Sequence, residues 1–170
     1  MLLDLGDLRV RSWQKSDLDA LVRYANNPRI AANLRDQFPH PYTRSAGIAY
    51  LAETRSAEIE ISFAMEYVGE AVGGIGFKLG TDIARLSAEM GYWLGEPFWG
   101  RGLTTRAVLA TSAWAFENYK LMRIFAMAFS HNVASMRVLE KAGFEREGIL
   151  RRSAVKNGVV INQVLYAKVR

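Results

Sequence analysis

Residues 89–107 read Glu-Met-Gly-Tyr-Trp-Leu-Gly-Glu-Pro-Phe-Trp-Gly-Arg-Gly-Leu-Thr-Thr-Arg-Ala, which predicts a strand, a turn and the start of a helix. In the strand, expected over 86–94, apolar side chains at alternate positions point one way and Glu89 points the other. One carboxylate therefore lies within an otherwise uncharged strand. After the turn, one apolar stripe is expected on the helix, formed by Leu103, Ala107, Ala110 and Trp114.

The turn itself, Gly100-Arg101-Gly102, has the composition of an anion site. The start of a helix carries unpaired backbone N–H groups and the positive end of the macrodipole, and a glycine lets another molecule approach the backbone. Hydroxyl donors and positive charge accompany it, supplied by Thr104, Thr105, Arg101 and Arg106. A phosphate or pyrophosphate would suit this turn. A turn that only starts a helix, with Arg106 as a solvated cation, is the alternative.

Composition predicts one domain, residues 1–170, in the cytoplasm. The 170 residues are 50% hydrophobic and 23% charged, which suits a single core. With no cysteine there is no disulfide, thiolate nucleophile or cysteine-based zinc site, which fits a reducing compartment. The first residues are acidic where a secretory signal would be basic, and no apolar run reaches the roughly 18 residues needed to span a bilayer, so no membrane partner is expected.

Charge and histidine content narrow the ligand classes. The net charge of +5, from 22 Lys plus Arg against 17 Asp plus Glu, modestly favours anionic ligands or partners. There is no basic block and no repeating pattern of aromatic and basic residues, so direct nucleic-acid binding is not expected. The two histidines, His40 and His131, are isolated, so no metal site is expected. His40 either lines an acceptor pocket with Phe38 and Tyr42 or only shapes its loop.

The rest of the chain alternates strand-like and helix-like segments, which predicts an α/β fold with a mixed sheet. Further strands are expected over residues 8–13, 58–66, 71–79, 123–130, 148–155 and 159–169. Helices are expected over 16–25, 29–34, 44–55, 103–118 and 132–142.

Several local signals define the ends and faces of these segments. Ser16 with Asp19 predicts a capping box, Ile48 and Leu51 are expected to face inward from the helix 44–55, and Ile59 is expected on the apolar face of the strand 58–66. A bulge or a close backbone approach is expected in the strand containing Gly73, Gly74 and Gly76. The last helix should start at Asn132 and end in a Schellman motif at Gly143, and Asn157-Gly158 predicts a type I′ hairpin.

Three segments together, 88–94, 99–102 and 132–144, resemble the GNAT superfamily of acyl-CoA N-acyltransferases. Within it the chain looks most like the RimJ/RimL group, which acetylates N-terminal amines of ribosomal proteins, and the resemblance covers almost the whole length. It implies a mixed, mostly antiparallel central sheet of about seven strands, splayed at the middle and flanked by about four helices. It also implies acetyl-CoA as cosubstrate, with no metal.

The resemblance assigns residues to parts of the cosubstrate, whose pantetheine arm would lie between the strand ending at Leu94 and the strand starting at Arg123. Residues implied to bind it are Tyr92, Trp93, Leu94, Gly100, Arg101, Gly102, Leu103, Thr104, Thr105, Asn132, Ser135, Arg137 and Lys141. Residues 92–94 and Asn132 would contact pantetheine and residues 100–105 the pyrophosphate. Asn132 is also explained as an N-cap and Lys141 as a helix-end cation.

Two positions depart from the family pattern. Pro97 stands where a Gln or Arg is frequent, and Arg106 stands where this group commonly has Glu. The first removes a side-chain contact to phosphate and the second adds one, and neither breaks the backbone cradle.

The expected reaction is direct attack of an amine on the thioester in a ternary complex, because no cysteine is present to form a covalent intermediate. Glu89 is the candidate general base, acting directly or through water, and Ser135 could donate a hydrogen bond or proton to the thiolate. Backbone N–H groups near Leu94 would polarise the carbonyl. Both side chains also have structural explanations, strand ordering for Glu89 and helix capping for Ser135.

The acceptor stays open between a protein N-terminal amine and another amine on the same scaffold, such as an aminoglycoside, a polyamine, an amino acid or a protein lysine. A catalytically idle acyl-CoA-binding module is the alternative from another class. A phosphate-loop nucleotidase is disfavoured because the turn lacks the Gly-Lys-Ser/Thr sequence. Homodimerisation also stays open.

Overall fold

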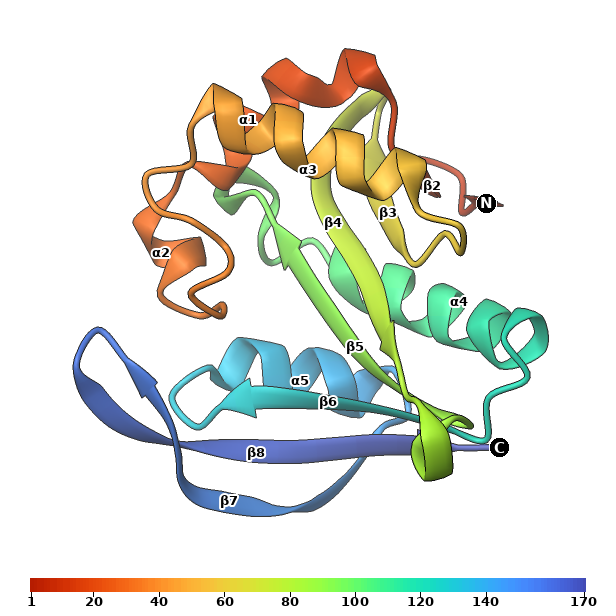
Figure 1. Cartoon of the computed structure of the whole chain (residues 1–170), viewed down its shortest axis with the longest axis vertical. Helices are drawn as coiled ribbons and strands as arrows, with labels where there is room; N and C mark the ends of the chain where they lie inside the picture. The colour runs from red at the N-terminus through yellow and green to blue at the C-terminus, as the bar shows by residue number, and fades with distance from the viewer. The chain divides into compact units, whose positions relative to one another are not determined.

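A computed structural model describes all residues, Met1–Arg170, as an α/β fold built on one eight-stranded sheet (Figure 1). The strand order is β1-β2-β3-β4-β5-β6-β8-β7, and β5 and β6 run parallel in a mostly antiparallel arrangement. The predicted mixed sheet is confirmed, with eight strands and five helices instead of about seven and four. The additional strand is β1, whose three residues are too few to show a pattern.

The strands are β1 (Leu2–Asp4), β2 (Leu8–Ser12), β3 (Ser62–Tyr67), β4 (Glu70–Leu79), β5 (Ser87–Leu94), β6 (Arg123–Phe129), β7 (Glu145–Lys156) and β8 (Val159–Val169). The helices are α1 (Leu18–Ala25), α2 (Pro28–Ala31), α3 (Arg44–Ser56), α4 (Leu103–Asn118) and α5 (Val133–Lys141). Short 3₁₀ turns occupy Lys15–Asp17, Asp82–Ala84 and Glu96–Phe98.

The chain forms two compact units. The first contains Met1–Gly76 and Tyr92–Ala107, and the second contains Phe77–Gly91 and Val108–Arg170. Because β4, β5 and α4 each continue from one unit into the other, the residues predicted to bind the cosubstrate are divided between the units.

In the first unit, α1 and α3 pack on the sheet through a core that includes Trp13, Leu21, Tyr42, Leu51 and Ala64. The two helices approach closely at Gly47, where an added Cβ would lie 2.9 Å from Leu18 Cδ1. The expected close approach in β4 is also present, since a Cβ at Gly73 would lie 2.5 Å from Trp93 O.

Three local predictions in this unit are wrong. Ile48 and Ile59 are each 54% exposed, and β3 begins only at Ser62 because the apolar alternation before it has no partner strand. The capping box lies at Gln14 and Asp17, where Gln14 N–H donates to the Asp17 carboxylate at 2.8 Å, and not at Ser16 and Asp19. The Asp17 carboxylate is held there by further contacts from the neighbouring strand, which sequence spacing cannot show.

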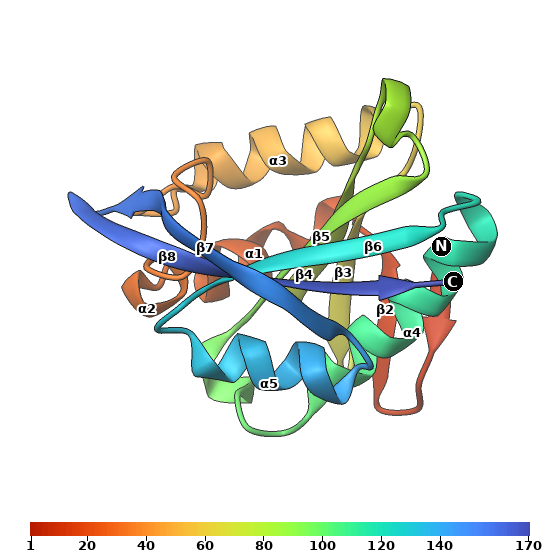
Figure 2. The same ribbon diagram turned by 90° about the horizontal axis from the view of Figure 1, so that it is seen from below.

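In the second unit, α5 packs beside β6, β7 and β8 (Figure 2), and both of its predicted ends are confirmed. The Asn132 side chain accepts from Ser135 N–H at 3.2 Å. Gly143 has φ +82, and Phe144 N–H donates to Leu139 O at 3.0 Å, as a Schellman motif requires. Asn157 and Gly158 both have positive φ, as the predicted type I′ turn demands.

The buried face of α4 differs in part from the prediction. Leu103 and Ala107 are buried as expected, whereas Ala110 and Trp114 are only half-buried. Thr111 and Ala115 are fully buried, so the covered stripe is rotated toward them. None of the helices combines the length and the apolar character that crossing a bilayer requires.

Candidate functional site

The turn between β5 and α4 presents bare backbone. Gly100 and Gly102 have φ of +76 and +73, and an added Cβ at either would meet no atom within 4 Å. Arg106 N–H donates to Gly102 O at 3.1 Å as the first turn of α4 closes. The N–H groups of residues 103–105 lie before that bond and have no intrahelical acceptor, so they can receive an anion.

An aromatic and ionic cluster holds the polypeptide between β5 and this turn. Trp99 Nε1 donates to Leu94 O at 2.7 Å, and the Arg29 guanidinium lies 5.3 Å from the Trp99 ring centre. Glu96 accepts from Asn27 Nδ2 at 2.7 Å and also pairs with Arg29. Residues far apart in sequence therefore fix the end of β5.

The side chain of Arg101 folds back on its own loop. Its guanidinium donates to Pro97 O at 3.2 Å and lies 5.7 Å from the Phe98 ring centre. Pro97 stands where the family pattern has a Gln or Arg side chain. It has no side-chain donor, but its carbonyl oxygen accepts the hydrogen bond from Arg101.

At the end of β5, alternate residues direct their backbone N–H and C=O groups toward β4 and away from it. Gly95 N–H donates to Val72 O in β4 at 2.7 Å, and Trp93 O also faces β4 beside Gly73. Because successive residues of a strand direct their N–H and C=O groups to opposite edges, the backbone of Tyr92 and Leu94 faces away from β4. Leu94 N–H is therefore directed to the edge where the pantetheine arm and thioester are expected.

Arg106 makes contacts that the sequence did not indicate. Its Nη2 donates to Asp7 Oδ1 at 2.8 Å and also to Leu5 O, so it joins the first turn of α4 to the turn between β1 and β2. The hydrogen bond from Arg106 lowers the pKa of Asp7 below its usual value. Neither alternative considered for Arg106 included this carboxylate partner, and a contact from Arg106 to phosphate stays a prediction.

We expect Asp7→Asn to lower the melting temperature slightly at pH 7 and to have a smaller effect near pH 3. A carboxylate with a lowered pKa stabilises the fold fully above its unfolded pKa, and this contribution is lost as pH falls through the folded pKa. Calorimetry of the wild type and Asp7→Asn at both pH values measures the difference, with Glu58→Gln as a control carboxylate on the surface. An equal difference at both pH values would contradict the paired charge.

In the second unit, Glu89 lies where the parallel ladder ends. The β5–β6 ladder comprises three pairs, Ser87↔Arg123, Ala88↔Ile124 and Glu89↔Phe125, although both strands continue. Met90 and Gly91 belong to the same unit and are outside the ladder. The half-buried Glu89 carboxylate is thus carried by the last paired residue, as expected for a strand pair that separates.

The start of α5 carries the other predicted residues of this unit. The Asn132 carboxamide oxygen caps the helix through Ser135 N–H, which leaves its NH₂ group directed elsewhere. Ser135 is half-buried, and Arg137 and Lys141 are exposed. Because they are four residues apart, Arg137 and Lys141 share one helix face and can act together on an anion.

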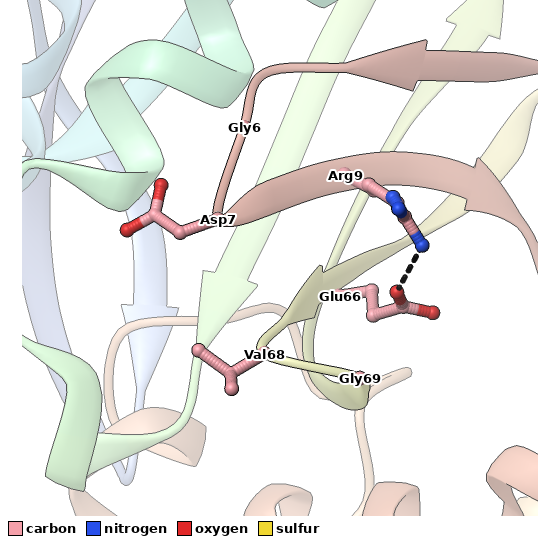
Figure 3. Close-up of a pocket in the computed structure, with 6 residues that line it drawn as sticks. All are labelled: Gly6, Asp7, Arg9, Glu66, Val68 and Gly69. Atoms are coloured by element: carbon pink, nitrogen blue, oxygen red, sulfur yellow. Dashed lines mark ion pairs between the residues drawn. The ribbon is translucent and has the colours of Figure 1, made fainter.

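A shallow pocket of about 220 Å³ lies elsewhere, between the β1–β2 and β3–β4 turns (Figure 3). Its charged side chains are already paired, Asp7 with Arg106 and Arg9 with Glu66 at 3.5 Å. The pocket therefore has no uncompensated charge that would select a ligand.

Neither histidine belongs to a ligand cluster. No group of three or more His, Asp or Glu side chains is arranged to hold a metal ion. His40 is exposed, while its neighbours pack inward, with Phe38 at 5.1 Å from Tyr42 and 5.7 Å from Trp93 between ring centres. His131 lies 5.7 Å from the Phe129 ring. The loop 38–42 is thus fixed on Trp93 in β5.

Two contacts of Trp99 at this site are not indicated by the sequence pattern, one local and one long-range. Trp99 belongs to the Trp-Gly-x-Gly motif. That motif does not indicate that the Trp99 indole donates to Leu94 O or that the Arg29 guanidinium lies over the Trp99 ring. A tryptophan directly before a Gly-x-Gly turn was the one local feature that could have suggested a structural clamp.

Comparisons with known proteins agree with this arrangement. The family model described as acetyltransferase (GNAT) domain matches residues 7–145. The probable N-acetyltransferase YjcK of Bacillus subtilis is 47% identical over 73 residues, a match covering 43% of this chain and only 40% of that protein. Spermidine N(1)-acetyltransferase of Escherichia coli is 24% identical, covering 92% of this chain and 83% of that protein. The structure of Mycobacterium smegmatis RimJ in complex with CoA-disulfide is similar with a TM-score of 0.85 and 25% identity, covering 95% of this chain and 81% of that one.

Proposed function

The chain belongs to the GNAT acetyltransferase family, and on that premise we propose that it transfers the acetyl group of acetyl-CoA to a primary amine, most specifically the α-amine of a protein N-terminus. One observation carries the proposal. The strand containing Glu89 leads into a turn with two open glycines and a helix start whose N–H groups have no intrahelical acceptor.

Acetyl-CoA would be held mainly by backbone groups. Residues 100–105 would bind the pyrophosphate, and the edge of β5 carrying Tyr92 and Leu94, next to Trp93, would bind the pantetheine arm. Asn132 would contact the same arm through its free NH₂, while Arg137 and Lys141 would meet the adenosine or its phosphates. When bound, the cosubstrate supplies an activated thioester, and Leu94 N–H would stabilise the oxyanion that forms on its carbonyl.

The reaction needs a neutral amine and an acid for the leaving thiolate. We propose that Glu89 accepts the proton that the attacking amine loses, directly or through water, and that the Ser135 hydroxyl assists the thiolate. An α-amine with pKa about 7.7 to 8.0 is roughly one tenth neutral at pH 7, whereas a lysine amine near 10.4 is almost entirely protonated. A single half-buried carboxylate is therefore sufficient assistance for an N-terminal amine.

The choice of acceptor rests on charge and on relatives. RimJ-like and spermidine-acetylating proteins are both similar to this chain, so the family alone does not select between a peptide and a polyamine. The net charge of +5 disfavours the approach of a polycation and favours an acidic peptide. We therefore propose the peptide acceptor, in the cytoplasm, with residues 1–170 acting as one catalytic domain.

Calorimetry with coenzyme A tests the proposed turn. We expect the wild type to bind coenzyme A, and Gly102→Val to bind it roughly tenfold more weakly, because a β-branched residue at φ +73 strains the turn and covers its backbone. Gly6→Val, at φ +86 in another open turn, is the matched control for strain alone. If neither protein gives a binding heat, the proposed function is wrong.

A thiol-release assay then identifies the acceptor. Acetyl-CoA is offered with peptides that have free N-termini, with the same peptides blocked, and with spermidine. Release with free peptides alone supports the proposal. Release with spermidine alone would assign the polyamine reaction instead.

A further inference from the structure

The β7–β8 hairpin continues beyond the strand that supports it. β6 pairs with β8 from Arg123↔Val169 to Phe129↔Gln163 and then ends, while β7 and β8 remain paired to Lys156↔Val159 (Figure 1). We call residues 150–163 the arm. A two-stranded hairpin without a third strand is marginally stable alone, so an additional strand would find an unfilled place here.

The arm has one open edge that continues the line of β6. Asn162 O accepts from Ser130 N–H at 3.0 Å, which shows that Asn162 directs its backbone toward the side of β6. Because backbone groups alternate along a strand, Val160 directs its N–H and C=O to the same side, where β6 has already ended. An extended peptide added at Val160 would lie end to end with β6, next to the segment 130–135.

The root of the arm is built to present cations. Between Leu150 and Ala154 the register of β7 shifts, and Arg152 has φ +53 in this bulge. The bulge is fixed by Asn162, whose side-chain oxygen accepts from Arg152 N–H at 2.7 Å, and by Ser153, whose hydroxyl contacts Gln163 at 3.1 Å. Arg151 and Arg152 are both exposed.

The C-terminal segment that contains the arm has an excess of basic residues. The segment 148–170 contains Arg151, Arg152, Lys156, Lys168 and Arg170 and no Asp or Glu, so it carries +5, which equals the net charge of the whole chain. The arm's other exposed side chains are aliphatic, among them Val155, Val159 and Val160. Exposed aliphatic groups and an open strand edge suit an extended peptide, whereas stacking of nucleobases requires aromatic side chains that the arm lacks.

We propose that the arm is a docking site for an extended acidic segment of the acceptor protein, which pairs with the edge of β8 at Val160 and whose carboxylates reach Arg151 and Arg152 of β7 across the face of β8. This inference rests on the proposed function, since the docked segment would follow the amine to be acetylated. We place the acidic residues at positions 4 to 7 of the acceptor, because four residues of an extended peptide span about 13 Å and follow the amine closely.

Peptide binding and acetylation, measured separately, test the proposal. Two fluorescent decapeptides share their first three residues and carry either Glu or Ser at positions 4 to 7. Anisotropy is measured with N-terminally blocked forms, so that docking is read without catalysis, and kcat/KM is measured with free forms. We expect the Glu peptide to bind and react about tenfold better at low salt, with the difference falling at 0.5 M salt.

The double variant Arg151→Gln/Arg152→Gln should remove most of this preference, leaving kcat/KM for the Ser peptide unchanged. Lys15→Gln/Arg55→Gln removes the same charge from exposed positions of the first unit and should keep the preference. Asn162→Ala, which frees the bulge, should weaken the preference about threefold without any change of charge.

Four outcomes would overturn the inference. Equal binding of both peptides, or equal loss in the two double variants, would show that only net charge acts. Tighter binding of a short single-stranded RNA that competes with the Glu peptide would assign the arm to nucleic acid. A dimer by sedimentation that Arg151→Gln/Arg152→Gln dissociates would assign it to a second copy of the chain. Loss of acetylation of every peptide with docking retained would instead contradict the proposed function and leave the docking site standing.

Discussion

Glu89→Gln should lower kcat for a peptide acceptor about 100-fold at pH 7. General-base assistance contributes at least about this factor when a positioned carboxylate accepts the proton of the attacking group. The amide cannot accept that proton, although it keeps the shape of the carboxylate and one acceptor oxygen. Steady-state kinetics with saturating acetyl-CoA measure the change.

The loss should lie in kcat and not in cosubstrate affinity or stability. The binding turn belongs to residues 100–105, so the affinity for coenzyme A in Glu89→Gln should stay within about twofold of wild type. Glu58→Gln, an exposed carboxylate just before β3, is the matched control and should retain full activity. An equal fall of melting temperature and activity in Glu89→Gln would instead assign Glu89 to ordering the strand.

The elements that could be predicted from sequence are those fixed by neighbours in the chain. The start of α5 depends on Asn132 and Ser135, three residues apart, and its end depends on the positive φ of Gly143 and on Phe144 and Leu139, five residues apart. The β7–β8 turn depends on two adjacent residues that tolerate positive φ. In each case the interacting groups are close in sequence, so a short pattern contains the whole cause.

The features that could not be predicted depend on contacts between distant segments. Arg106 binds Asp7 across about 100 positions of sequence, and an arginine at the start of a helix looks the same whether it meets a phosphate or a carboxylate. Ile59 alternates as a strand residue should, yet pairing begins three residues later. The apolar alternation predicts a strand, but the position where the strand begins depends on where the partner strand pairs with it.

A buried ionic cluster in the first unit also depends on contacts between separate elements, so no short sequence pattern indicates it. Arg11 lies on β2 next to the buried Val10, and its side chain is only 11% exposed. It donates from Nη1 and Nη2 to Asp17 at 2.7 and 2.8 Å and from Nε to Glu66 at 2.6 Å. These hydrogen bonds raise the pKa of Arg11 further above its usual value, so its charge persists at all ordinary pH values.

Arg11→Met should destabilise the protein by about 3 to 5 kcal/mol, because removing the cation leaves the Asp17 and Glu66 carboxylates buried without their partner. For a chain of this size the melting temperature should fall by about 10 °C. Calorimetry or thermal circular dichroism at pH 7 measures the fall.

Arg9→Met, two residues earlier on the same strand, is the matched control. Arg9 also contacts Glu66, at 3.5 Å, but its side chain is 50% exposed, and an exposed pair contributes at most about 1 kcal/mol. Its substitution should therefore shift the melting temperature by no more than about 3 °C. Equal shifts of the melting temperature in the two variants would mean that the buried ion pairs of Arg11 stabilise the fold no more than the exposed pair of Arg9 does. A large shift confined to Arg11→Met would show that the first unit depends on this cation for the joining of β2 to the start of α1.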